Sequence, residues 1–230
     1  RSQRVLAGFS RFAGRDLVVD EDASSSEFAS AHRNLGMAHL LKASGVLECD
    51  PVDVVEGYTR QCSITVSCRD LAMMAATLAN AGTHPLTHER LLSRPVVRQV
   101  MSVMMTCGMY DAAGDWMTDV GIPAKSGVSG GVIGALPGQV GIAVFSPRLD
   151  THGSSVRGVR VFERLSGDMG MHLMDVAQEG RSALRGSYVS EGEDPVTVYE
   201  MQGDLRFAGA ETVVRAIAAA DHSTTRVALD

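Results

Sequence analysis

The sequence predicts a mixed α/β (α+β) protein in which an antiparallel sheet is flanked by helices. Two apolar runs lie on either side of Pro137-Gly138 within residues 121–147, the pattern of a β-hairpin. Apolar stretches with helix start signals precede this hairpin. After a segment rich in Gly, Ser and acidic residues, a strand–turn–helix–strand pattern begins. We therefore expect a first domain over residues 1–183, a linker over 184–195 and a second, partial domain over 196–230.

The first strong helix signal is Ser24 with Glu27 three residues later, which has the form of a capping box. It predicts one helix from Ser24 to about Ala43. On that helix Glu27 and Asn34 fall on the same face, so a carboxylate and an amide would stand two turns apart. Glu27 as a simple cap with Asn34 in solvent is the alternative.

Further helices are expected where cap residues precede apolar runs. Asp50-Pro51 predicts a helix toward Cys62, and Ser67 predicts an apolar helix that ends before Gly82. Thr87 and Ser93 predict two short helices, the second reaching Cys107. After the hairpin, residues 154–161 are expected as a strand and 162–183 as a helix.

Composition narrows the function classes. The 230 residues carry a net charge of −6 and are 45% hydrophobic and 21% charged, which is typical of a globular protein and argues against a nucleic-acid partner. No apolar run reaches the roughly 20 residues of a membrane span. The four cysteines show no Cys-x-x-Cys spacing, so we expect reduced thiols and a cytoplasmic protein.

No cofactor or metal is predicted. His84 and His88 are four residues apart, but Pro85 lies between them and the pattern is not His-Glu-x-x-His. The glycines of residues 127–134 match neither a dinucleotide-binding fingerprint nor a phosphate loop.

The triplet Lys125-Ser126-Gly127 is expected on the first arm of the hairpin. In serine acyl transferases of the penicillin-binding type, a Lys-Thr/Ser-Gly triplet lies on a strand that lines the cleft. The lysine there supplies positive charge, and the glycine lets the substrate approach the backbone. A solvated loop is the alternative for so short a motif.

Several blocks in a fixed order resemble the C-terminal two-thirds of the serine-dependent glutaminase family, which shares its fold with β-lactamases and penicillin-binding proteins. The blocks are Ser26-Glu27 with Arg33-Asn34, Tyr58 to Ser63, Met74 to Asn80, Cys107 to Asp111, and Pro123 to Gly131. Residues 199–205 and 207–210 resemble the start of a STAS domain, a small regulatory module.

The resemblance implies hydrolysis of L-glutamine to L-glutamate and ammonia through a glutamyl-serine acyl-enzyme. Tyr110 is implied as a catalytic proton carrier, and Lys125, Ser126 and Gly127 as supporting residues. The implied substrate-binding residues are Glu27, Asn34, Tyr58, Tyr110 and Val128, the last through its backbone N–H. The family also implies a homo-oligomer, and the tail implies a possible regulatory protein partner.

The nucleophile of this family belongs to a Ser-x-x-Lys motif, which the 230 residues do not contain. We therefore expect a middle piece of a longer protein whose nucleophile lies outside this chain, and expect the piece alone to be inactive and poorly soluble. A non-catalytic glutamine-binding protein with a STAS partner-binding module is the alternative. A penicillin-recognising enzyme is a third hypothesis, which the Glu27 and Asn34 pair disfavours.

Overall fold

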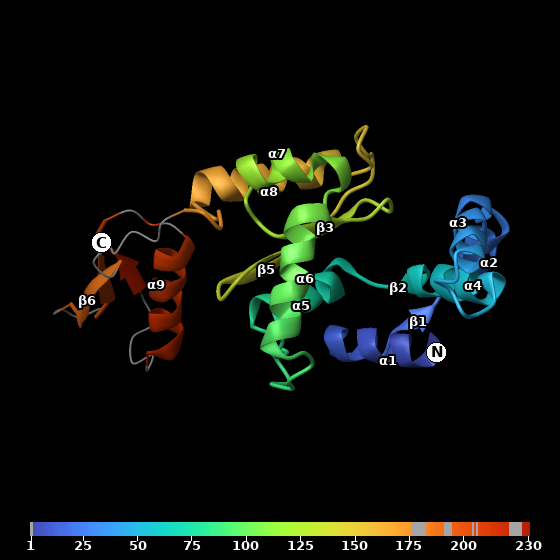
Figure 1. Ribbon diagram of the computed structural model, residues 1–230. Helices are drawn as coiled ribbons and strands as arrows, with labels where there is room; N and C mark the ends of the chain where they lie inside the picture. Colours follow the sequence, from blue (N-terminus) through green and yellow to red (C-terminus); the bar gives the residue numbers. More distant parts are fainter. Residues whose placement is uncertain (1, 176–182, 191–194, 204, 206, 221–226) are drawn as a thin grey trace. The chain divides into compact units, whose positions relative to one another are not determined.

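The computed structural model describes residues 2–175, 183–190, 195–203, 205, 207–220 and 227–230. Figure 1 shows the elements of the chain, which divides into two units. The first comprises Arg1–Val103 and Gly131–Phe145, and the second comprises Met104–Gly130 and Ser146–Asp230. Among the described residues, no helix has both the length and the apolar character needed to cross a membrane.

The first unit combines helices with two antiparallel strand pairs. Its helices are α1 Ser2–Ala13, α2 Glu21–Ala29, α3 His32–Ala43, α4 Pro51–Cys62 and α5 Cys68–Ala79. Its strands are β1 Val18–Val19, β2 Ile64–Thr65, β4 Gly131–Leu136 and β5 Val140–Phe145, with β1 paired to β2 and β4 to β5. Helix α6, Arg94–Cys107, begins in the first unit and ends in the second.

The hairpin predicted around Pro137-Gly138 is confirmed as β4 and β5, with Leu136 opposite Val140. Helix α5 packs on both strands of this hairpin (Figure 1). At Gly141 the packing is so close that an added Cβ would lie 2.0 Å from the backbone nitrogen of Ala76. The glycine therefore lets the helix backbone lie directly on β5.

Two of the predicted helix starts are confirmed in detail. The carboxylate of Asp50 accepts the backbone N–H of Val52 at 2.8 Å, and Pro51 occupies the first helical position of α4. Ser67 and Asp70 form a reciprocal capping box at the start of α5.

The single helix expected from Ser24 to Ala43 is wrong. The cap is Asp20, whose carboxylate accepts the N–H of Ala23 at 2.9 Å, so α2 begins one turn earlier and Ser24 lies buried inside it. The chain then breaks at Ser30, whose hydroxyl bonds back to the carbonyl oxygens of Ser26 and Glu27. Such back-bonding competes with helix continuation. Helix α3 is therefore a separate element.

Helices α2 and α3 both pack on α4. Their shared apolar cluster has Ala31, Ala38 and Val55 at its centre, with Phe28, Leu35 and Leu47 at its edge. These side chains form the apolar contact between the packed helices.

The second unit contains the 3₁₀ turn η1 Tyr110–Ala112, helix α7 Ala113–Asp119, strand β3 Ala124–Ser126 and helix α8 Val156–Met169. Its core contains an aromatic pair, Trp116 and Phe162. The rings of Trp116 and Phe162 lie 5.4 Å apart, and the indole nitrogen of Trp116 donates to the carbonyl oxygen of Ile122 at 2.7 Å.

Three further expectations differ from the structure. Residues 154–161 do not form a strand, because the Ser155 hydroxyl accepts the N–H of Gly158 at 3.0 Å and starts α8 there. That helix ends at Met169, before the left-handed Gly170, and residues 176–182 of the expected longer helix lie outside the described residues. The short helix after Thr87 is absent, since His88 has a φ of +59° that an α-helix cannot continue.

The last part of the second unit is a three-stranded sheet with one helix. It contains β6 Leu184–Val189, β7 Thr197–Met201, α9 Phe207–Ala219 and β8 Val227–Leu229. The central strand β7 pairs antiparallel with β6 and parallel with β8. The stretch expected to be a linker from residue 184 therefore contains a strand, formed by β-prone residues such as Tyr188 and Val189. Residues 191–194 of that stretch lie outside the described residues.

Candidate functional site: two groups of residues

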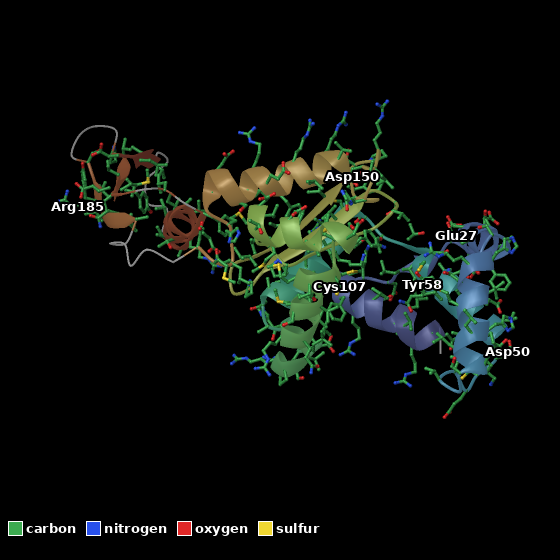
Figure 2. All side chains as sticks on the ribbon, turned by 45° about the horizontal axis from the view of Figure 1, so that its top comes forward. Glu27, Asp50, Tyr58, Cys107, Asp150 and Arg185 are labelled. Carbon is green, nitrogen blue, oxygen red and sulfur yellow. The ribbon has the colours of Figure 1, made fainter. Side chains whose placement is uncertain are left out.

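Three of the expected binding residues lie on the helical group α2–α4 of the first unit. Glu27 is in the last turn of α2, Asn34 is in the first turn of α3, and Tyr58 is in the middle of α4. Glu27 and Tyr58, both labelled in Figure 2, are exposed. Asn34 is half-buried. The reasoning that put Glu27 and Asn34 on one face of one helix is wrong, since the break at Ser30 separates them. What brings their helices together is the packing of α2 and α3 on α4.

The second unit brings Tyr110 and Lys125 into direct contact. The ammonium nitrogen of Lys125 lies 4.4 Å from the centre of the Tyr110 ring, a cation–π arrangement. The same ammonium donates a hydrogen bond to the carbonyl oxygen of Ser126. Lys125 thus fixes a positive charge against one face of the phenol.

Gly108 makes this contact possible. The backbone N–H of Ser126 donates to the carbonyl oxygen of Gly108 at 3.1 Å. A Cβ on Gly108 would lie 1.7 Å from the carbonyl oxygen of Ala124, which no side chain could tolerate. Strand β3 therefore lies directly against the backbone that leads into Tyr110.

Tyr110 itself has a φ of +57°, in the left-handed region that non-glycine residues rarely adopt. Holding a bulky residue there costs on the order of 1–3 kcal/mol, and such strain concentrates at functional sites. Its side chain is partly exposed.

Lys125-Ser126-Gly127 does not lie on an arm of the hairpin as expected. Lys125 and Ser126 belong to the separate strand β3, and residues 127–130 turn before β4 begins at Gly131. The turn is closed by the N–H of Gly130, which donates to the carbonyl oxygen of Gly127 at 2.9 Å. The N–H of Val128 takes no part in that bond, and the Val128 side chain is exposed. Among the described residues, the buried Ser126 hydroxyl has no hydrogen-bond partner.

Sequence reasoning missed a loop beside the second group of site residues, which are Tyr110, Lys125, Ser126, Gly127 and Val128. Asp150 lies at the base of the loop formed by residues 148–155 (Figure 2), and its carboxylate accepts the N–H groups of His152 and Ser154, each at 2.9 Å. The Nδ1 atom of His152 lies 2.9 Å from Oδ1 of Asp111. An Asp followed by Thr-His-Gly-Ser is a signal for such a turn, but nothing local in sequence points to Asp111.

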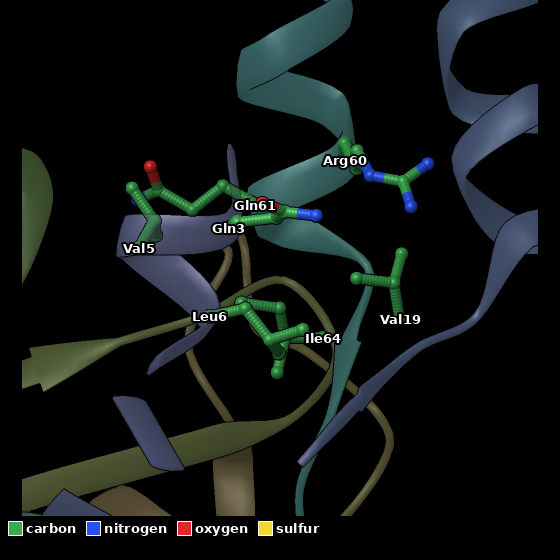
Figure 3. A pocket seen from close by; sticks show the side chains of 7 residues that line it. All are labelled: Gln3, Val5, Leu6, Val19, Arg60, Gln61 and Ile64. Atoms are coloured by element: carbon green, nitrogen blue, oxygen red, sulfur yellow. The ribbon is translucent and has the colours of Figure 1, made fainter. Parts of the chain in front are cut away.

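The small pocket in Figure 3 lies in the first unit between α1, α4 and the β1–β2 pair, and none of the expected site residues lines it. Its lining is mostly apolar, and the guanidinium of its Arg60 is paired with Glu21. A wider groove beside α1 is lined by Arg11, Arg15 and Glu89 among others, again without an expected site residue. Within the part of the chain that the structure describes, no cluster of three His, Cys, Asp or Glu side chains is suited to hold a metal ion.

The serine–lysine pair of an acyl transferase is not found here. The lysines of the chain are Lys42 and Lys125, and the residues three positions before them are His39 and Ile122. The ammonium of Lys42 donates to the carbonyl oxygen of Glu48.

Comparison with known proteins gives a consistent result. The profile of the glutaminase family matches residues 1–174. The chain is 50% identical over all its 230 residues to a glutaminase of Corynebacterium glutamicum and covers 55% of that protein. It is 47% identical, again over its full length, to a glutaminase of Corynebacterium efficiens, of which it covers 54%. The chain thus spans about half the length of these curated relatives.

Solved structures show the same similarity to glutaminases. A crystal structure of the protein Mglu matches 99% of this chain and 56% of its own chain, with a TM-score of 0.75 and 49% identity. A probable glutaminase of Bacillus subtilis matches 75% of this chain and 59% of its own, with a TM-score of 0.73 and 30% identity. The mixed α/β fold is therefore that of solved glutaminases, and the chain belongs to the glutaminase family.

Proposed function

We propose that this chain is the part of a glutaminase that carries its substrate-binding residues, and that the protein hydrolyses L-glutamine to L-glutamate and ammonia. The observation that carries the proposal is the 50% identity to a glutaminase along the whole chain. Mglu, 50% identical, has been crystallised in a glutamate form. Glutamate is the product of the proposed reaction, which supports a site for it in this chain.

Glu27, Asn34 and Tyr58 are proposed to bind the amino-acid end of the substrate. The α-ammonium requires an acceptor with negative charge, which Glu27 supplies. The α-carboxylate requires hydrogen-bond donors, which the Asn34 amide and the Tyr58 hydroxyl can supply. All three come from helices that pack together around one apolar cluster.

Tyr110 and Val128 are proposed to act at the amide end. Tyr110 would carry a proton to or from the nucleophile, and the N–H of Val128 would stabilise the oxyanion of the tetrahedral intermediate. Lys125 supports Tyr110 through its charge and its packing on the ring. Ser126 and Gly127 hold the strand and turn that present Val128.

The reaction also needs a nucleophile, which we propose lies outside these 230 residues. The chain has no Ser-x-x-Lys, and it spans about half the length of its curated relatives. A serine there would attack the side-chain amide, release ammonia and leave a glutamyl ester that water hydrolyses.

For the tail we propose a partial STAS domain that binds a regulatory protein. The support is its topology, a β7–α9–β8 unit whose two strands pair in parallel, with β6 added antiparallel to the central strand β7. The first domain is proposed to share the β-lactamase-like fold, since the antiparallel hairpin β4–β5 is covered by α5.

We also propose that the protein is a cytoplasmic homo-oligomer. The cytoplasmic location is supported by four free, exposed cysteines.

The alternative is a protein that binds glutamine through the same residues without hydrolysing it. Ammonia release from L-glutamine, measured on the gene product expressed from its own start codon, separates the two. Turnover supports the enzyme. Binding of glutamine by calorimetry without ammonia release would leave the non-catalytic protein as the better description.

A further inference from the structure

The loop of residues 148–155 is a built structure within the second unit. Asp150 accepts the N–H groups of His152 and Ser154, and its own N–H donates to the carbonyl oxygen of Ser154 at 2.8 Å. Leu149 and Ser155 form a β-bridge at its base. The loop therefore has one preferred shape and can present His152 in a fixed direction.

The tip of this loop lies on the second group of site residues. Gly153 has a φ of +81°, and a Cβ placed on it would lie 4.0 Å from Cε2 of Tyr110 and 3.9 Å from Cγ1 of Val128. The preceding residue, His152, is joined to Asp111, the residue after Tyr110. The loop thus lies close to the Tyr110 ring and is joined to the residue that follows Tyr110 in the chain.

We propose that His152 is a positioning residue for the amide end of the site. Its ion pair with Asp111 holds the loop of residues 148–155 against Tyr110 and Val128. This inference rests on the proposed function, because it assumes that Tyr110 and Val128 act on the substrate amide. It adds a residue, a contact and a pH dependence that the proposed function does not contain.

The charges around His152 favour its protonated form. The hydrogen bond to Asp111 is the main cause that raises the pKa of His152 above its ordinary value of 6.5, and Asp150 in the loop and Asp115 on α7 act in the same direction. The same pair lowers the pKa of Asp111 below 3.8. Within the described residues, Lys125 is the cation that packs on the ring of Tyr110, the neighbour of Asp111.

The contribution of the His152–Asp111 pair depends on pH. A raised histidine pKa means that the stabilising pair is fully present below pH 6.5 and is lost as the pH rises through the higher value of the folded protein. A lowered aspartate pKa means that the pair persists down to pH values below 3.8. Between these limits the pair holds the loop most strongly, and its contribution weakens as the histidine loses its charge in more alkaline solution.

Two substitutions with a matched control test the proposal in the full gene product. His152→Asn and Asp111→Asn remove the charge pair, whereas Asp168→Asn removes an exposed carboxylate that pairs with Arg164 on α8. At pH 6 we expect kcat to fall about threefold to tenfold in the first two variants, with little change in KM, because a displaced catalytic group slows the chemical step. The ratio of wild-type kcat to His152→Asn kcat should decrease toward one as the pH is raised from 6 to 9. Asp168→Asn should behave as wild type. An equal ratio at both pH values would overturn the proposal.

A second readout needs no activity. The ring protons of His152, assigned by NMR from the His152→Asn spectrum, should titrate above pH 6.5 in the wild type and closer to 6.5 in Asp111→Asn. The ring signals of Tyr110 should shift with the same midpoint in the wild type and lose that transition in His152→Asn. If the wild type releases no ammonia, the proposed function fails while these signals still decide the positioning contact. If the protein is active but the Tyr110 signals ignore His152, the positioning role fails alone.

Discussion

The ammonium of Lys125 lies 4.4 Å from the centre of the Tyr110 ring, and the two residues are held together by the close approach of Gly108 to Ala124. A fixed cation on one face of a phenol both orients the ring and stabilises negative charge that develops on its oxygen.

Replacing Lys125 should slow the reaction without abolishing substrate binding. Lys125→Met keeps a flexible chain of similar length but removes the charge, and a cation–π contact contributes on the order of 0.5–2 kcal/mol. We therefore expect kcat to fall about 3- to 30-fold. Steady-state ammonia release is the measurement, and Lys42→Met is the control because Lys42 bonds to Glu48 on the other unit. An equal loss in both variants would refute a specific role for Lys125.

Gly108→Ala should be strongly destabilising. The added methyl would meet the carbonyl oxygens of Ala124 and Met104 at 1.7 and 2.3 Å, both of them backbone atoms that cannot move aside cheaply. We expect the free energy of unfolding to fall by about 3 kcal/mol or more, as strained and overpacked sites typically cost. Denaturant unfolding checks this. Gly114→Ala is the matched control, since nothing lies within 4 Å of its added Cβ and alanine favours a helix. A harmless Gly108→Ala would contradict the close contact.

Asp70→Asn should weaken the start of α5. The carboxylate accepts from the N–H and hydroxyl of Ser67 and from the guanidinium of Arg15 at 2.9 and 2.6 Å. An amide keeps one acceptor oxygen and loses the charge, so we expect a loss of about 2 kcal/mol in the free energy of unfolding.

The effect of Asp70→Asn should not depend on pH near neutrality, unlike the effect of His152→Asn. The Arg15 guanidinium holds the pKa of Asp70 well below its ordinary value of 3.8, so the carboxylate is charged and its contribution complete throughout neutral pH. The effect of Asp70→Asn should therefore be the same at pH 5 and pH 9. A loss that disappears at either pH would show that another group is responsible.

Local signals in the sequence predicted the elements whose causes are local. Asp50 with Pro51, Ser67 with Asp70, and the Pro137-Gly138 turn each act within a few residues, and all three were confirmed. The start at Ser24 was wrong because Asp20 competes for the same cap and the hydroxyl of Ser30 ends the helix. The strand expected at 154–161 was wrong because one cap residue, Ser155, decided the local structure.

The candidate site was found through resemblance more than through pattern. Glu27, Asn34, Tyr58, Tyr110 and Val128 were named because whole blocks matched a family, and their roles stay predictions. The contact between Lys125 and Tyr110 and the pair of His152 with Asp111 join residues far apart in sequence, which periodicity and caps cannot reveal. Such contacts depend on the tertiary fold.

Glu27→Gln should mainly weaken substrate binding. The isosteric amide removes the negative charge that the α-ammonium of glutamine requires, so we expect KM to rise about 10- to 100-fold with a smaller change in kcat. Asp22→Asn, on the same helix, serves as the control, since that exposed carboxylate has no proposed role. If KM were unchanged by Glu27→Gln, this residue would not bind the substrate ammonium.

The most direct test of the account is ammonia release from L-glutamine by the full gene product, measured for the wild type and for Tyr110→Phe. Loss of a positioned proton carrier typically costs 10²- to 10⁴-fold, so we expect turnover by the wild type and a kcat lower by about 10² or more in the variant. Turnover by the wild type that survives Tyr110→Phe unchanged would contradict the proposed role of Tyr110. A wild-type protein that releases no ammonia would contradict the proposed function itself.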